Sequence, residues 1–157
     1  MTTLRCKCGK DILLDDENVE KFKQYVWTCN GHSVAAYPTG TNLACLVIEI
    51  PVGFIPDHKD RNFHNNLKIN LRVASLSQNR ANTPKQKNNT TGYKGVRFHF
   101  RRGKYYARIQ KDHKLHFLGY YETAQEAALA YNRGALKLFG EFAYLNKICN
   151  EEDLVKC

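Results

Sequence analysis

Four side chains between positions 57 and 79 combine the groups that metal-dependent hydrolysis requires. Asp57 and His58 are adjacent, Asn70 follows twelve residues after the histidine, and Asn79 follows nine residues later. A carboxylate can hold a divalent cation while an imidazole beside it takes a proton from water. The amide oxygen of Asn79 is a hard ligand of the kind that Mg²⁺ or Mn²⁺ accepts. These residues predict one cation site beside a general base.

The residues between these positions predict the elements that would bring them together. Three asparagines favour a looped excursion after His58: Asn62, Asn65 and Asn66. The apolar residues within 71–74 indicate a short strand. Ser75 and Gln78 have the spacing of a capping box, which would open a helix that carries Asn79. The predicted order is strand, loop, strand, helix, a ββ-α unit.

This stretch resembles the HNH nucleases, in particular the phage- and intron-type homing endonucleases. The resemblance rests on three motifs: Asp57-His-Lys-Asp-Arg-Asn62, Asn70-Leu-Arg72 and Ser77-Gln-Asn79. It implies that His58 is the general base and that Asn70 orients it. It further implies that Asp57 and Asn79 hold one Mg²⁺ or Mn²⁺, and it makes Arg72 a candidate phosphate clamp.

Two positions depart from the family pattern. Arg61 stands where the family often has Gly, and Leu43-Ala44-Cys45 stands where the family has Leu-His-Arg. These departures keep an alternative open, a DNA-binding protein or transcription regulator whose nuclease unit is vestigial.

The charge distribution favours a polyanionic partner. The 157 residues carry a net charge of +9. Residues 51–91 contain seven basic and two acidic residues, and residues 92–146 contain ten and four. A basic surface of this kind attracts nucleic acid. The sequence shows no secretory signal and no apolar run long enough to span a bilayer, so we expect a soluble intracellular protein with no membrane partner.

The cysteines raise a separate question about metal binding. The six cysteines are at positions 6, 8, 29, 45, 149 and 157. Without a secretory signal we expect them to be reduced thiols. Cys6, Cys8, Cys29 and His32 could together form a four-ligand Zn²⁺ site, although their spacing is not that of a standard zinc knuckle. Free thiols are the favoured interpretation. A zinc-dependent module that binds RNA or protein is a third, less supported function.

Residues 1–50 are expected to form an α/β region that supports the nuclease unit. A helix is predicted from Asp15 onward, with Val19, Phe22, Tyr25 and Val26 on one face. Strands are predicted over 34–37 and 43–50. After the nuclease unit, the polar residues 83–91 include Lys85 and Lys87 and are expected to form a linker.

Residues 92–146 have the pattern of a small separate domain. Runs rich in Val, Ile, Phe and Tyr over 93–100, 104–111 and 115–120 predict a three-stranded antiparallel meander. A capping box at Thr123 and Glu126 opens a predicted helix that ends at Gly140. With the helix on one face, alternation leaves a basic, aromatic face open to a partner.

This segment resembles the plant ethylene-response-factor (APETALA) type DNA-binding domain. The shared pattern includes Tyr93-Lys-Gly-Val-Arg97, Leu118-Gly-Tyr-Tyr121, the run from Thr123 to Tyr131, and Phe139-Gly-Glu-Phe-Ala-Tyr-Leu-Asn146. The resemblance implies that strand residues contact DNA in the major groove. Phe117 replaces the usual Trp and Arg108 the usual Glu, so base preference is not carried over. The expected DNA-binding residues include some at the margins of the sheet. They are Lys94, Arg97, His99, Arg101, Arg102, Arg108, Gln110 and Phe117.

Together these patterns predict an α+β protein that acts as a site-directed DNA endonuclease. The expected parts are a supporting region (1–50), an HNH ββ-α metal-finger nuclease unit (51–82), a basic linker (83–91), a sheet-plus-helix DNA-binding domain (92–146) and a tail (147–157). One active site per chain predicts a monomer on double-stranded DNA that nicks one strand.

Overall fold

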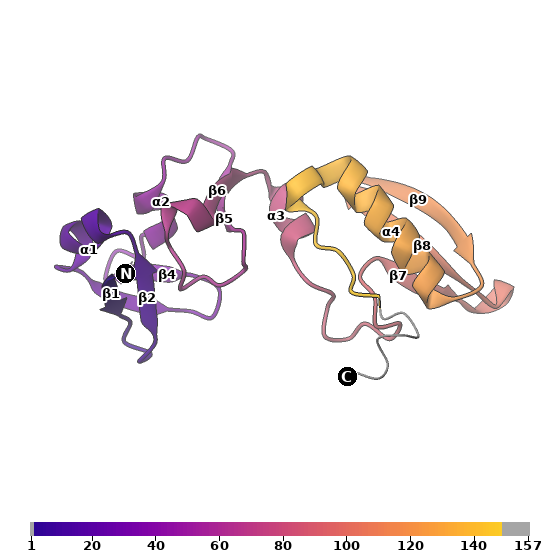
Figure 1. Ribbon diagram of the computed structural model, residues 1–157, viewed down its shortest axis with the longest axis horizontal. Helices are drawn as coiled ribbons and strands as arrows, with labels where there is room; N and C mark the ends of the chain where they lie inside the picture. Colours follow the sequence, from indigo (N-terminus) through magenta and orange to yellow (C-terminus); the bar gives the residue numbers. More distant parts are fainter. Residues whose placement is uncertain (1, 149–157) are drawn as a thin grey trace. The chain divides into compact units, whose positions relative to one another are not determined.

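The computed structural model describes residues 2–148, and the predicted tail lies mostly outside them. The chain divides into two compact units, Met1–Asn79 and Arg80–Cys157 (Figure 1). The described residues form small antiparallel sheets and helices, which agrees with the α+β class. No helix among these residues is both long enough and apolar enough to cross a membrane.

The N-terminal unit is built from short two-stranded ladders and two short helices. Its first elements are β1 (Thr2–Arg5), β2 (Asp11–Leu14), α1 (Asp16–Phe22), β3 (Val26–Cys29), β4 (Val34–Tyr37) and α2 (Leu43–Val47). Strand β1 pairs with β2, and β3 pairs with β4, both antiparallel. Their inward side chains form one apolar cluster in which Ile12, Leu14 and Leu43 are almost completely buried.

Two predictions for this region are wrong. The predicted helix ends at Phe22, and Tyr25 and Val26 are each 45% exposed, because the chain turns there and enters β3. The stretch 43–50 begins with helix α2 instead of a strand. Asn42 caps that helix by accepting a hydrogen bond from the Ala44 N–H at 3.0 Å, and Leu43, Ala44 and Val47 are buried.

The next three elements occur in the predicted order. Strand β5 (Ile55–His58) pairs antiparallel with β6 (Leu71–Ala74), and helix α3 (Leu76–Asn82) follows directly. The ladder places Asp57 opposite Arg72 and His58 opposite Leu71. A 3₁₀ turn at Lys68–Asn70 ends the loop and leads into β6. This arrangement brings the predicted chemical residues onto two paired strands and the helix after them.

The C-terminal unit is a three-stranded meander covered by one long helix. Strands β7 (Val96–His99), β8 (Lys104–Lys111) and β9 (Lys114–Tyr121) pair in the order β7-β8-β9, and α4 (Ala124–Phe139) lies across them (Figure 1). Thr123 and Glu126 form the predicted capping box, and Gly140 ends the helix with a φ of 54°. These predictions are confirmed.

The helix packs closely on the sheet because the facing side chains are small. Ala107, Ala127 and Ala128 are fully buried in a cluster that also contains Tyr131. Gly95 lies under Tyr131 with a φ of +74°, so any Cβ at this position would overlap the tyrosine ring. The hairpin between β8 and β9 turns at Asp112 and His113, which both have positive φ, as a tight two-residue turn requires.

Candidate functional site

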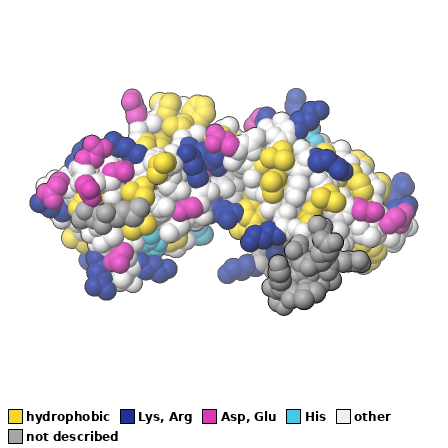
Figure 2. Space-filling view, viewed as in Figure 1, with side chains coloured by type: hydrophobic (Ala, Val, Ile, Leu, Met, Phe, Trp, Pro, Cys, Tyr) yellow, Lys and Arg dark blue, Asp and Glu magenta, His cyan; other side chains and the backbone are white. Residues whose placement is uncertain are grey.

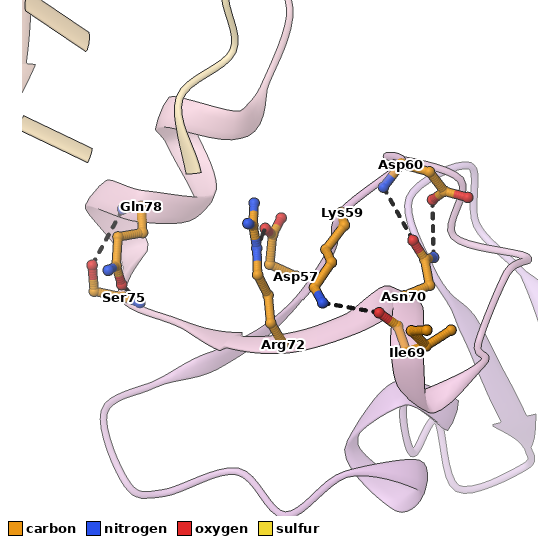
Figure 3. Close-up of polar contacts among 8 residues, drawn as sticks. All are labelled: Asp57, Lys59, Asp60, Ile69, Asn70, Arg72, Ser75 and Gln78. Carbon is orange, nitrogen blue, oxygen red and sulfur yellow. Dashed lines mark hydrogen bonds and ion pairs between the residues drawn. The ribbon is translucent and has the colours of Figure 1, made fainter. Parts of the chain in front are cut away.

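Asp57 and Arg72 form a buried ion pair on adjacent strands. Arg72 Nε donates to Asp57 Oδ2 at 2.8 Å, and the two side chains are 11% and 6% exposed. Figure 3 shows the arginine of β6 directed at the carboxylate of β5. Because charged donors bind carboxylates strongly in a dry environment, Arg72 fixes the orientation of Asp57. The arginine predicted as a phosphate clamp therefore has a structural partner within the site.

His58 is oriented by an asparagine that sequence reasoning assigned only to a turn. His58 Nε2 lies 3.2 Å from Asn66 Oδ1, and Asn66 Nδ2 donates to the Phe63 carbonyl at 3.0 Å. The second bond fixes the amide, so its oxygen faces the imidazole and accepts from Nε2–H. In the neutral ring the lone pair then lies on Nδ1, which is the nitrogen able to accept a proton from water.

The surroundings of His58 favour its neutral form. Burial lowers the pKa of His58 below its usual 6.5, and this effect outweighs the hydrogen bond that His58 donates to Asn66 and the charges of Asp60 and Asp57, which act in the opposite direction. A general base must be unprotonated before it acts, so the imidazole is in the useful state near neutral pH.

The side-chain hydrogen bonds of Asn70 go to the loop that follows His58 and not to the imidazole itself. Its Oδ1 accepts from the Asp60 N–H at 3.1 Å, and its Nδ2 donates to Asp60 Oδ1 (Figure 3). The same Nδ2 also donates to the Asn65 carbonyl. These three hydrogen bonds tie the buried Asn70 amide to Asp60 and Asn65, and so fix the start of the loop that follows His58. Asn70 therefore positions the histidine through the backbone.

Asp60 is a further member of this loop network. Burial opposes its ionisation, but hydrogen bonds from the Asn62 N–H, Asn65 and Asn70 together lower the pKa of Asp60 below its usual value. The ionised carboxylate accepts from Asn62 N at 2.8 Å and from Asn65 Nδ2 at 2.7 Å. The three asparagines and Asp60 thus hold the loop in one conformation.

Asn79 is presented by the helix that the capping box starts. Ser75 N–H donates to Gln78 Oε1 at 2.8 Å, and Gln78 N–H donates to Ser75 Oγ at 3.2 Å (Figure 3). This reciprocal pair confirms the predicted cap. Asn79 lies one residue beyond it, half-buried, in the first turns of α3.

Arg72→Ala is expected to lower the free energy of unfolding of the N-terminal unit by about 3 kcal/mol, because the Asp57 carboxylate would remain buried without its counter-charge. Urea unfolding followed by the fluorescence of Trp27, the single tryptophan, measures this effect. Lys68→Ala is the matched control, since it breaks an exposed pair with Glu17 and should cost less than about 1 kcal/mol. Equal losses for the two variants would show that the Asp57–Arg72 pair is not desolvated.

A second cluster in this unit consists of thiols. The sulfur atoms of Cys6, Cys8 and Cys29 all lie within 4.8 Å of one another. The cluster lowers the pKa of Cys8 to about 6, chiefly through a hydrogen bond with Cys29, and raises the pKa of Cys29 to about 11. The predicted fourth member, His32, does not belong to the group. It is exposed, and its backbone N–H donates to Asn30 in a turn.

The open face of the three-stranded sheet carries an aromatic and basic surface. Rings on β7, β8 and β9 contact one another edge-on or tilted, with centroids 5.0–6.3 Å apart: His99, Tyr106, Phe117 and Tyr120. Arg102 lies over Tyr120 and Arg108 lies over Tyr106. We call these six residues the aromatic face. Strand alternation predicts Tyr106 on this face, although it was not among the expected DNA-binding residues, and Tyr120 was missed altogether.

The other predicted DNA-binding residues divide into two groups. Arg97 is exposed on β7 opposite Tyr106, Gln110 is exposed on β8, and Arg101 lies in the 3₁₀ turn after β7. Lys94 differs, because its ammonium donates to the carbonyls of Arg80, Ala81 and Thr83 at 2.6–3.0 Å. That side chain anchors the end of α3. Figure 2 shows Lys and Arg side chains over both units on the face it presents.

The described residues place an acid–imidazole pair on the first of two antiparallel strands, and a helix follows the second strand directly. The chain is 35% identical over 141 residues to a protein of Acanthamoeba polyphaga mimivirus named an uncharacterized HNH endonuclease, with 83% of this chain and 70% of the relative covered. The chain belongs to the HNH endonuclease family. No family model and no solved structure matches it.

Proposed function

We propose that this protein is a DNA endonuclease of the homing or nicking type, in which His58 is the general base. The observation that carries the proposal is the hydrogen-bond chain from Phe63 through Asn66 to His58, which orients a half-buried imidazole whose surroundings favour the neutral form. A protein of this kind works in the compartment that contains its target DNA.

The residue types at positions 57 and 79 suit a hard divalent cation. Asp57 and Asn79 offer carboxylate and amide oxygens, which Mg²⁺ and Mn²⁺ take as ligands together with water. We assign one Mg²⁺ or Mn²⁺ to these two residues. When bound, the cation would stabilise negative charge that develops on the phosphate and on the leaving oxygen.

The remaining residues of the site act by positioning. Arg72 fixes the carboxylate of Asp57, and Asn70 fixes the loop that follows His58. His58 takes a proton from a water molecule as that water attacks the scissile phosphorus in line with the departing 3′ oxygen. Because the base and the acid come from adjacent residues of one strand, the paired strand β6 holds both in place.

We assign target recognition to the C-terminal unit, by way of its aromatic face and the basic residues beside it. A twisted antiparallel sheet fits the major groove of DNA. Arginines and lysines bind phosphates, while side chains that reach base edges read the sequence. The residues proposed for these contacts are Arg97, His99, Arg101, Arg102, Tyr106, Arg108, Gln110, Phe117 and Tyr120.

Cleavage of supercoiled plasmid tests the proposal. With Mg²⁺ or Mn²⁺ we expect the relaxed form to appear before the linear form, because one site per chain cuts one strand at a time. A chelator added in excess should abolish the reaction, and fresh Mg²⁺ should restore it. Persistence of cleavage in chelator, or conversion straight to linear DNA by monomeric protein, would contradict the mechanism.

A second candidate function is DNA binding without cleavage. It is favoured by Arg61, which adopts a φ of 64° at a position where the family often has Gly, and by Ala44 and Cys45 in helix α2 in place of the family's His-Arg pair. Selection of duplexes from a random pool, followed by mapping of cuts on each strand, separates the two functions. Specific binding with intact DNA under both metals would establish the non-catalytic alternative.

A further inference from the structure

We propose that Cys6, Cys8, Cys29 and His64 bind one Zn²⁺ as a structural site, separate from the hydrolytic site at Asp57 and His58. The fourth ligand differs from the one predicted by sequence spacing. His64 is far from the cysteines in the chain, but it is buried and its Nε2 lies 3.9 Å from the sulfur of Cys8. His32, near Cys29 in sequence, is exposed and outside the cluster.

The distances are close to those of a tetrahedral zinc centre. Zn–S bonds of about 2.3 Å place the sulfur atoms about 3.8 Å apart, and a histidine nitrogen about 3.6 Å from each sulfur. The three sulfur atoms here lie within 4.8 Å of one another, and the nitrogen lies 3.9 Å from Cys8. Exposed Cys8 and half-buried Cys29 have room to move as the ligands close on the metal.

The backbone holds the four residues in place without help from the metal. The loop that carries Cys6 and Cys8 is a tight turn, with bonds from Cys6 N to Lys10 O and from Gly9 N to Cys6 O, and Gly9 has a φ of +84°. This loop is joined to β3, which carries Cys29, by the bond from Lys7 N to Trp27 O at 2.9 Å. A site built on paired backbone segments loses little conformational entropy when it binds metal.

The histidine is attached to the same core through β2. Leu13 N donates to His64 O, and Asn66 N donates to Leu13 O, both at 2.9 Å. These two bonds fix the loop 64–66 against the strand that follows the cysteine turn. Three segments far apart in the sequence thus meet at one point, and each brings a ligand.

The ligand types select zinc over the cation assigned to the hydrolytic site. Thiolates and imidazole suit Zn²⁺, whereas Mg²⁺ and Mn²⁺ take oxygen donors. Zinc binding would release the thiol protons to solvent, because only the thiolate is a ligand. Since Asn66 is two residues from His64 and holds His58, the zinc would also stabilise the loop that orients the general base.

Elemental analysis and cobalt substitution test the proposal on the full-length protein, purified in reductant without chelator. We expect one zinc per chain, and a cobalt form with sulfur-to-cobalt charge-transfer absorption and the intense visible bands of a tetrahedral ion. Cys8→Ser and His64→Ala should each weaken zinc binding by more than about 100-fold. Loss of a residue that only forms a hydrogen bond with a metal ligand typically weakens metal binding by about 100-fold at most. His32→Ala and Cys45→Ser are matched controls and should keep wild-type zinc content.

Several outcomes would overturn the proposal. These are a zinc content near zero with no affinity for added Zn²⁺, a disulfide among Cys6, Cys8 and Cys29 in the protein as purified, or wild-type affinity in His64→Ala. Loss of zinc in His32→Ala would identify a different fourth ligand and equally refute it. DNA cleavage is not a readout in these experiments, so their result is independent of the proposed nuclease activity.

Discussion

His58→Ala is expected to lower the rate of plasmid nicking by about 10²–10⁴-fold, the contribution typical of a positioned general base. The structure gives the reason. His58 is part of a buried hydrogen-bond chain that sets which ring nitrogen carries the lone pair, and no other histidine in the described residues occupies an equivalent place on β5. Single-turnover cleavage of a mapped target duplex measures the chemical step directly.

The variant must be compared with two others. His32→Ala removes an exposed histidine of the same unit and should cleave at the wild-type rate. Asn66→Ala removes the acceptor of the His58 Nε2–H, and we expect an intermediate loss because the base remains while its orientation is no longer fixed. If His58→Ala cleaves as fast as the wild type, His58 is not the base. If Asn66→Ala has no effect, the inferred tautomer is wrong.

Gly95→Ala is expected to lower the free energy of unfolding of the C-terminal unit by about 3 kcal/mol or more. Two costs combine at this residue. The φ of +74° is strained for any residue with a Cβ, at about 1 kcal/mol. The added methyl would also overlap the Tyr131 ring and lie 2.9 Å from the Arg108 carbonyl, in a packed core where the ring cannot move away.

Gly103→Ala separates these two costs. Gly103 also has a positive φ, +63°, but nothing lies within 4 Å of the position its Cβ would take. We expect a loss of only about 1 kcal/mol for this variant. Denaturant unfolding followed by tyrosine signals in near-ultraviolet circular dichroism reports this unit, while Trp27 fluorescence reports the other. Equal losses for the two variants would mean that the Tyr131 ring does not press on Gly95.

The C-terminal unit was the most predictable part of the chain, and local patterns explain why. The β8 range was predicted residue for residue, and the helix begins and ends at its predicted cap and glycine. In this unit strand alternation, turn residues and a capping box all indicate the same elements. An element can be predicted from the sequence when its local signals agree in this way.

Residues 43–50 show how local signals can mislead. Their β-branched and apolar side chains favour a strand, but they also place Leu43, Ala44 and Val47 on one side of a helix. The Asn42 cap and the burial of these three residues stabilise the helix. Such short apolar runs fit both periods, so packing determines the outcome.

Sequence alone determined the order of strand, loop, strand and helix around Asp57, His58 and Asn79, because each element there is specified by residues within a few positions of one another. Only the tertiary structure decided that Asn66 and not Asn70 forms a hydrogen bond with the imidazole, and that His64 lies beside the Cys8 thiol whereas His32 is exposed. The physical reason is that these partners belong to different segments. Their meeting depends on how β2, β3 and the loop before β6 pack on a shared core, which spacing along the chain does not encode.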